Sequence, residues 1–326
     1  MTRFKPLLLP LLLLVPLAFV VGGCGAAKDA SWPDKPGPKV VVSFAPIYCF
    51  AANVAGDDAA VKCVMGTTGP HHFQPTDTEA RLAARANLFL INGLNLDNQI
   101  AGTIQKNSGN KGLKLIDLGS RLPKELLKEG VCKHAHHDGD HSGHDHGNDP
   151  HTWLGPDFAV RYVEAIRDEL ITADPSHKDG YTRRSAEYVA KLNALKADGV
   201  AMLKDKKDRK LLAFHDSLVY FGDTFGLEIK DAVQKMAGSE PNAKELQETI
   251  ANAKKHGVRL IAVEPQYTAN NAAKTILAEL RKDPALADAD VVEIDPLETV
   301  KPDDLTADWY EKMMRANLER LSKAMK

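Results

Sequence analysis

The feature that most constrains the fold of this chain is an alternation of short apolar runs with helical segments, which occurs twice. The first series predicts strands at residues 39–44, 60–65, 88–91 and 113–116, and helices at residues 47–55 and 77–86. The second series predicts strands at residues 210–214, 227–233, 258–263 and 291–294, and helices at residues 217–225, 243–256, 269–282 and 307–325. Such alternation is typical of an α/β protein whose parallel sheets are flanked by helices.

A long helical pattern separates the two series. It covers residues 157–204, with a break near Asp174-Pro175. The part of the chain that follows the N-terminal segment has about 290 residues, enough for two lobes at roughly 100 to 200 residues per domain. We therefore predict an α/β fold with two lobes, each built on a parallel sheet, joined by a long rigid helix. The predicted parts are an N-terminal lobe at residues 39–174, a connecting helix at residues 175–205 and a C-terminal lobe at residues 206–326.

The N-terminal segment has the pattern of an export signal. A basic start precedes a proline-broken apolar run, Leu7 to Val21, which is too short for a comfortable membrane span. Small residues then precede Cys24, as at a bacterial lipoprotein cleavage site. We predict a signal peptide at residues 1–23 and a lipidated Cys24 that starts a tether at residues 24–38. Membrane lipid would then hold the exported protein on a bacterial membrane, facing the periplasm or the cell exterior. An ordinary cleaved signal with an incidental Cys24 is the alternative.

The charge of the chain disfavours one class of partner. Without residues 1–23, 40 of the 42 basic residues remain against all 44 acidic ones, which gives a formal charge of −4. Nothing in this balance favours nucleic acid.

The cysteines after Cys24 are odd in number: Cys49, Cys63 and Cys132. In an oxidising compartment a Cys49–Cys63 disulfide is one interpretation, and three free thiols are the other. Cys132 borders a histidine-rich segment and would add a soft ligand there.

The segment CKHAHHDGDHSGHDHGNDPHTWL, residues 132–154, has the composition of a metal-binding tract. Six of the chain's 12 histidines fall within residues 134–146, among aspartates, glycines and a serine. Imidazole binds Zn(II), Cu(II) and Ni(II), and a segment with so little apolar surface is expected to be a solvated loop. We predict an accessory metal loop, and a linker that binds metal only incidentally is the alternative. Its histidines are His134, His136, His137, His141, His144 and His146.

Four polar residues stand where ligands are expected in such a fold. In open α/β sheets, ligands bind beyond the carboxyl ends of the strands. His71 follows the predicted strand at residues 60–65, His215 follows Phe214 directly, and Asp295 follows Ile294. His151 follows the loop, in Asp149-Pro150-His151-Thr152-Trp153. Each histidine alone also fits a capped or core residue, but together the four favour a metal site.

At these residues the chain resembles a known family, the cluster A-I solute-binding proteins of metal ABC transporters, in the zinc-uptake and TroA-like group. The resemblance covers residues 39 to the end. The segments that carry it are PHHFQPTDTEARLAARANLFLINGLNLD (residues 70–97), DPHTWLGP (149–156), FHDSLVYFGDTFGL (214–227), VEPQYT (263–268) and IDPL (294–297). A histidine-rich loop directly before the second of these ligand motifs is similar to the zinc branch of the family.

The resemblance implies a ligand set, in which His71, His151 and His215 bind the ion and Asp295 is the fourth ligand or an adjacent acceptor. Some zinc-type members have Glu just before the first histidine. This chain has Pro70 there, which leaves Asp295 or water as the fourth ligand.

Two neighbouring residues receive different expectations. His72 falls at a position that varies in the family, so we interpret it as a bystander. Glu264 is a candidate to accept a hydrogen bond from a ligating histidine, as carboxylates often do in metal sites. A strand-end carboxylate that faces solvent is the alternative for Glu264.

The resemblance also implies a function without catalysis. A monomeric solute-binding protein would capture Zn(II) between its lobes and deliver it to a membrane permease with its ATPase. Three imidazoles and one carboxylate suit tetrahedral Zn(II), whereas Mn(II) prefers more oxygen, and manganese-type relatives tend to have Glu at the position of His215. The open alternatives are a Mn(II) or Fe(II) receptor, a metal-dependent surface adhesin, a metal buffer and a secreted zinc hydrolase, although no H-E-x-x-H motif is present.

Overall fold

The computed structural model describes residues 32–130, 147–235, 237–265 and 271–326. These residues belong to one compact unit. The predicted signal peptide, the lipidated Cys24, most of the tether, Cys132 and the accessory metal loop at residues 134–146 lie outside the described residues. None of the helices that the structure describes is long and apolar enough to cross a membrane.

The first sheet has four parallel strands in the order β2-β1-β3-β4. Its strands are β1 (Lys39–Val42), β2 (Ala60–Cys63), β3 (Leu88–Ile91) and β4 (Lys114–Asp117), and its helices are α1 (Ala45–Ala55), α2 (Asp77–Ala83) and α3 (Asn98–Ser108). Alternate residues face opposite layers: Val40 and Val42 pack with α1, whereas Val41 packs with α2 and α3. Both faces are covered, which explains why the strands are continuous apolar runs.

The second sheet repeats this arrangement, with parallel strands in the order β6-β5-β7-β8. Its strands are β5 (Lys210–His215), β6 (Glu228–Gln234), β7 (Leu260–Val263) and β8 (Asp290–Glu293), and its helices are α6 (Val219–Phe225), α7 (Ala243–His256) and α8 (Asn271–Arg281). Leu212 and Phe214 pack with α7 and α8, whereas Leu211 and Ala213 face the other side, toward the first sheet's main core cluster.

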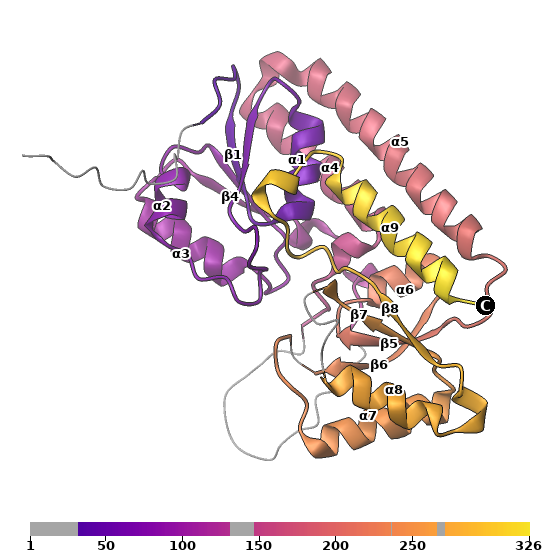
Figure 1. Ribbon diagram of the computed structural model, residues 1–326. Helices are drawn as coiled ribbons and strands as arrows, with labels where there is room; N and C mark the ends of the chain where they lie inside the picture. Colours follow the sequence, from indigo (N-terminus) through magenta and orange to yellow (C-terminus); the bar gives the residue numbers. More distant parts are fainter. Residues whose placement is uncertain (1–31, 131–146, 236, 266–270) are drawn as a thin grey trace, which may run out of the picture. The chain divides into compact units, whose positions relative to one another are not determined.

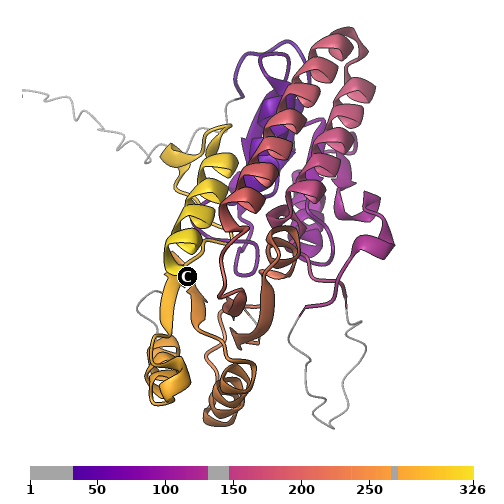
Figure 2. The same cartoon turned by 90° about the vertical axis from the view of Figure 1, so that its right-hand side faces the viewer.

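Two long helices connect the sheets, α4 (Pro156–Ala173) and α5 (Lys178–Leu203), and the last helix, α9 (Trp309–Ala324), packs against α5. Figures 1 and 2 show α5 running along the molecule, with α4 and α9 beside it and the second sheet following its carboxyl end. Helix α5 can approach Phe225 of α6 and Leu318 of α9 closely because Gly199 of α5 has no side chain. A Cβ at Gly199 would lie 2.5 Å from Phe225 Cε1 and 2.7 Å from Leu318 Cδ1. One buried apolar cluster includes Val40 of β1 and Ala262 of β7, so the two sheets share a core.

Short 3-10 turns complete the described fold: Gly119–Arg121, Lys124–Leu126, Thr152–Leu154, Pro175–His177, Pro284–Leu286 and Pro302–Asp304.

The predicted fold class is confirmed: two parallel sheets flanked by helices and a 26-residue connecting helix are present. The turn at Pro175–His177 breaks the long helical segment where the sequence predicts it. Helix α3 was not among the predicted helices. Its apolar signal is weak because only Ala101 and Ile104 are buried along its 11 residues.

A Cys49–Cys63 disulfide was one of the two interpretations of the sequence. This interpretation is wrong, because both thiols are free in the structure. Each has its own acceptor: Cys49 Sγ donates to the Thr306 carbonyl at 3.4 Å and Cys63 Sγ to the Met65 carbonyl at 3.0 Å. Burial raises the pKa of both thiols, that of Cys63 to about 12, so both remain protonated and unreactive near neutrality.

The turn after β3 generates a stability prediction. Gly93 has φ of 81°, and a Cβ there would overlap the Asp117 carboxylate. We expect Gly93→Ala to lower the free energy of unfolding by at least about 2 kcal/mol, measured by urea denaturation. The matched control is Gly102→Ala in α3, where a Cβ meets nothing within 4 Å. That change should raise the free energy of unfolding by about 0.5 to 1 kcal/mol. Equal effects of the two substitutions would contradict this account of the turn.

Candidate metal centre

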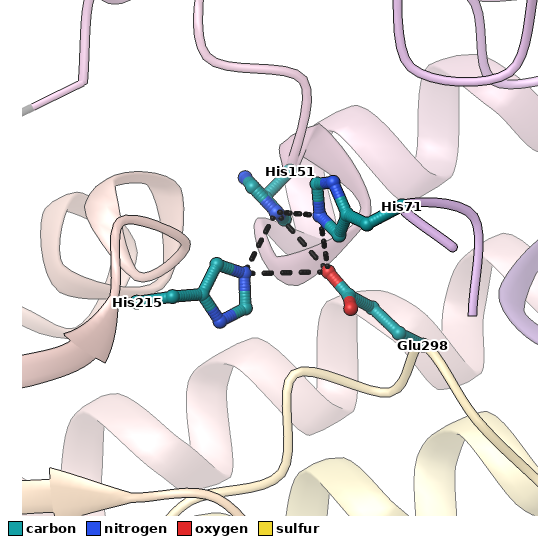
Figure 3. Close-up of side chains that lie close together, drawn as sticks. All are labelled: His71, His151, His215 and Glu298. Atoms are coloured by element: carbon teal, nitrogen blue, oxygen red, sulfur yellow. Dashed lines mark hydrogen bonds and ion pairs between the residues drawn. The ribbon is translucent and has the colours of Figure 1, made fainter. Parts of the chain in front are cut away.

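Four side chains converge between the two sheets: His71, His151, His215 and Glu298 (Figure 3). Each contributes one atom, and all four atoms lie within 4.8 Å of one another. Three of them are histidine Nε2 atoms and the fourth is Glu298 Oε1. This is the one group of potential metal ligands found in the described part of the chain.

Each of these side chains is carried by a loop beyond a strand or by a strand end. His71 lies between β2 and α2, and His151 directly precedes the Thr152–Leu154 turn. His215 is the last residue of β5, and Glu298 lies in the turn after β8. The sheets thus bring their carboxyl-terminal loops together, which is where open α/β sheets bind ligands.

Five of the six separations among the four atoms match a tetrahedral ion. Glu298 Oε1 lies 3.2 Å from Nε2 of His71 and of His151, and 3.4 Å from Nε2 of His215. His151 Nε2 lies 3.4 Å from His71 Nε2 and 3.2 Å from His215 Nε2. A regular tetrahedron around Zn(II), with bonds of about 2.0 to 2.1 Å, has edges of roughly 3.3 to 3.4 Å. Five edges of the cluster therefore have the size that one such ion requires, and the sixth, between Nε2 of His71 and Nε2 of His215, is at most 4.8 Å.

Two carboxylates outside the cluster orient the imidazoles. His151 Nδ1 donates to Asp149 Oδ1 at 3.0 Å, and His215 Nδ1 donates to Glu264 Oε1. An ionised carboxylate only accepts, so each Nδ1 carries a proton and each Nε2 turns its lone pair toward the cluster. Lone pairs that face one another at this distance repel unless a cation or a proton lies between them. The arrangement is thus built for a cation.

Without a metal ion, protons bound to the histidines relieve the repulsion between the facing lone pairs. Burial alone lowers the pKa of His151, but Asp149 and Glu298 outweigh it and raise the pKa to about 9. In the same way, burial lowers the pKa of His215, and Glu264 and Glu298 raise it well above its ordinary value. Burial raises the pKa of Glu298, yet hydrogen bonds from the three histidines hold it well below its usual range. Glu298 is therefore ionised near neutrality.

Asp295 does not belong to the group of four, so the expectation that it supplies the fourth ligand requires correction. Its Oδ1 accepts a hydrogen bond from the Leu297 amide at 2.7 Å, and its main chain pairs with the Asn317 side chain. Leu297 has φ of 64°, which turns the backbone so that Glu298 enters the cluster. Burial, with Glu264 and Glu298 nearby, raises the pKa of Asp295 to about 6. Asp295 shapes the turn, and Glu298 supplies the carboxylate.

The turn that carries Glu298 is tied to the segment that carries His151. The Trp153 indole N–H donates to the Pro296 carbonyl at 2.8 Å, and Tyr310 Oη donates to the Trp153 carbonyl at 2.7 Å. Trp153 is fully buried. These contacts join residues far apart in sequence, so two ligands are held in place before any ion arrives.

The remaining residues singled out in the sequence fall around the cluster. Glu264 is buried and contacts His215, and so it does not face solvent. Its hydrogen bond is of the kind expected beside a metal ligand. His72 is exposed and lies outside the cluster. The accessory metal loop lies outside the described residues.

Comparison with known proteins agrees with this site. The family model described as "ZnuA: Zinc-uptake complex component A periplasmic" matches residues 40–324. The zinc-binding protein AdcA of Streptococcus pyogenes serotype M3 (strain ATCC BAA-595 / MGAS315) is 30% identical over 295 residues, covering 87% of this chain. The chain spans only 55% of that relative's length. The high-affinity zinc uptake system protein ZnuA of Bacillus subtilis (strain 168) is 25% identical over 264 residues, which are 80% of this chain and 82% of that protein.

Solved structures show the same fold. The structure titled "Crystal structure of ZnuA" has a TM-score of 0.71 and 26% identity, covering 89% of this chain and all of that one. The solute-binding protein FpvC of Pseudomonas aeruginosa, in complex with Mn2+, has a TM-score of 0.73 at 24% identity, covering 89% of this chain and 98% of that one. Taken with the cluster of three histidines and a glutamate, these matches establish that the chain belongs to the family of periplasmic zinc-uptake component A proteins, which are metal-binding solute-binding proteins and not enzymes.

Proposed function

We propose that this protein captures Zn(II) between its two lobes and delivers it to the permease of an ABC transporter. The observation that carries the proposal is the match between five of the six ligand separations, at 3.2 to 3.4 Å, and the edges of a zinc tetrahedron. Membership of a zinc-uptake family also supports zinc as the captured ion.

The choice of zinc over manganese or iron rests on the donor set. Three imidazoles and one carboxylate oxygen are ligands that suit Zn(II), whereas Mn(II) favours more oxygen ligands and a higher coordination number. The related proteins from Streptococcus pyogenes and Bacillus subtilis are named for zinc binding and zinc uptake. A Mn(II) or Fe(II) receptor would need water or further carboxylate oxygens around the same three histidines.

The proposed cycle includes the parts of the chain that the structure does not describe. Residues 1–23 would be removed on export, and lipid on Cys24 would hold the protein at the membrane through the tether at residues 24–38. The loop at residues 134–146 would gather zinc near the site. The N-terminal lobe at residues 39–174 and the C-terminal lobe at residues 206–326 would then close on the ion, with residues 175–205 as the connecting helix.

Lobe movement in this cycle is expected to be small. The shared apolar core includes Val42 of β1, Leu192 of α5 and Leu260 of β7, and separation of the lobes would expose it to water. Closure would therefore act mainly through the ligand loops, and the metal-bound arrangement of these loops would be what the permease recognises.

A metal titration tests the proposed function. The exported chain would carry asparagine in place of all six histidines of residues 134–146, so that only the cluster remains. Calorimetry should show one tight Zn(II) site and Mn(II) binding weaker by at least roughly 100-fold. His215→Ala should weaken zinc binding by a similar factor, whereas His256→Ala, at the end of α7, should not. A His215→Ala protein that kept full zinc affinity would exclude the cluster as the receptor site.

Zinc affinity should rise with pH between about 6 and 9. The pKa of His151 is about 9 and that of His215 is raised, so both are largely protonated at pH 7 in the metal-free protein. Zinc must displace these protons, on the order of one to two per ion. Calorimetry in buffers of different ionisation enthalpy measures the number released, and Asp149→Asn should reduce it because it removes the largest carboxylate contribution to the pKa of His151. Proton release of zero at pH 7 would contradict the assigned charges.

A further inference from the structure

A cavity of about 220 Å³ lies beside the metal centre. Three of the four cluster residues line it: His71, His215 and Glu298. The remaining lining mixes polar side chains with apolar surface and comes from Thr67, Thr68, Gly69, His72, Ala237, Glu264 and Thr299. Since a water molecule occupies roughly 30 Å³ of liquid, the cavity has room for several waters. It is therefore large enough for an ion that still carries part of its hydration shell.

The four side chains of the cluster differ in their exposure to solvent. The side chain of His71 is 23% exposed, whereas those of His151, His215 and Glu298 are 3%, 4% and 7% exposed. His71 is therefore the cluster residue most open to solvent. The cavity adjoins His71 and also reaches His215 and Glu298, so it provides a path from solvent to these two buried ligands.

His72 lies on this path next to His71. Its side chain is exposed, and its ring centroid lies 6.5 Å from that of His71, whereas the three cluster rings are 5.1 to 5.5 Å apart. His72 is thus outside the tetrahedron and beside its most exposed ligand. In the described part of the chain, no hydrogen bond to the His72 ring is found, in contrast to the Nδ1 atoms of His151 and His215. Neither ring nitrogen of His72 thus has a hydrogen-bond partner among the described residues, although Nε2 lies against Gly238.

The walls of the cavity suit a partly hydrated ion. The hydroxyls of Thr67, Thr68 and Thr299 can donate to and accept from water molecules. The loop that carries the first two is held near the Glu298 turn, because the Val300 amide donates to the Gly66 carbonyl at 2.9 Å. Gly69 allows this approach, since a Cβ there would lie 3.2 Å from Glu298 Cβ.

We propose that His72 is a transit ligand, which binds the incoming zinc ion in this cavity before His71 does. A ring nitrogen of His72 replaces one water of the hydrated ion, and His71 replaces the next. Glu298, His151 and His215 then complete the tetrahedron as His72 and the last waters leave. Each step exchanges one ligand for another with no change in the oxidation state of zinc, any proton on the incoming imidazole passes to a departing water and so to solvent, and release follows the same steps in reverse. The inference rests on the proposed function and adds a route to it.

A packing role is the competing explanation for His72. A Cβ on Gly238, in the loop between β6 and α7, would lie 2.6 Å from His72 Cε1, so the ring and this loop are in close contact. If His72 only fills space there, a side chain of similar size should replace it. His72→Gln separates the two roles, because glutamine keeps much of the volume and lacks an imidazole.

The experiment is stopped-flow measurement of zinc association and chelator-induced zinc release, followed by tryptophan fluorescence. Trp153 is the reporter, since its ring centroid lies 5.1 Å from that of His151. The full exported chain would be used, with and without the six loop histidines of residues 134–146. Both His72→Ala and His72→Gln should slow association and release by about tenfold each, so that the dissociation constant stays within about twofold of its original value. His256→Ala is the control and should leave both rates unchanged.

Two outcomes overturn the inference. Wild-type rates in both His72 variants would show that the ion does not use this ligand. A change in His72→Ala that His72→Gln restores would assign His72 a packing role. His71→Ala, measured in parallel, separates this failure from failure of the proposed function: tight zinc binding without His71 would overturn the receptor site itself.

Discussion

The mutual approach of three imidazole nitrogens and one carboxylate oxygen is the constraint on which the rest of the site depends. Separations of 3.2 to 3.4 Å between electron-rich atoms are unfavourable unless a cation or protons lie among them. The protein maintains these separations through two hydrogen bonds on the far side of the rings. His151 Nδ1 donates to Asp149 and His215 Nδ1 donates to Glu264. Those carboxylates fix which nitrogen faces inward and also make each imidazole a better ligand. The same carboxylates raise the histidine pKa values, so metal capture is coupled to proton release.

The two-sheet fold brings the four ligand side chains together. Two sheets with the same strand order direct their carboxyl ends toward a common point, and each contributes loops that carry ligands. The apolar core shared between the sheets, together with α5 and α9, limits how far these loops can separate. The Trp153 to Pro296 hydrogen bond then joins the segment that carries His151 to the turn that carries Glu298. Preorganisation of this kind lowers the cost of ordering ligands when an ion binds.

Much of the fold could be predicted from the sequence, because both sheets are buried on two sides and their strands stand out as apolar runs. Helix α3 was missed because it is polar on average and buries only Ala101 and Ile104. The sequence singles out His71 and His215 because they follow predicted strands. It singles out His151 because this residue follows the histidine-rich loop, in a segment that resembles the family. Glu298 could not be singled out, since it lies beyond the strand end and reaches the cluster only through the left-handed backbone of Leu297. Asp295 follows the end of a strand, as ligands are expected to do, but its carboxylate accepts a hydrogen bond from the Leu297 amide. A leucine with positive φ gives no local sequence signal, and so the carboxylate three residues further on was overlooked.

The most direct test of the account is X-ray absorption at the zinc edge, on the protein loaded with one equivalent of zinc and with the six loop histidines replaced. The account predicts four nitrogen or oxygen neighbours at about 2.0 to 2.1 Å, with multiple scattering from three imidazoles. Glu298→Ala should replace one carboxylate oxygen by water and leave the imidazole signal intact, whereas Asp295→Asn should leave the four neighbours unchanged. Six neighbours, fewer than three imidazoles, or a first shell altered by Asp295→Asn would contradict a tetrahedral site built from His71, His151, His215 and Glu298.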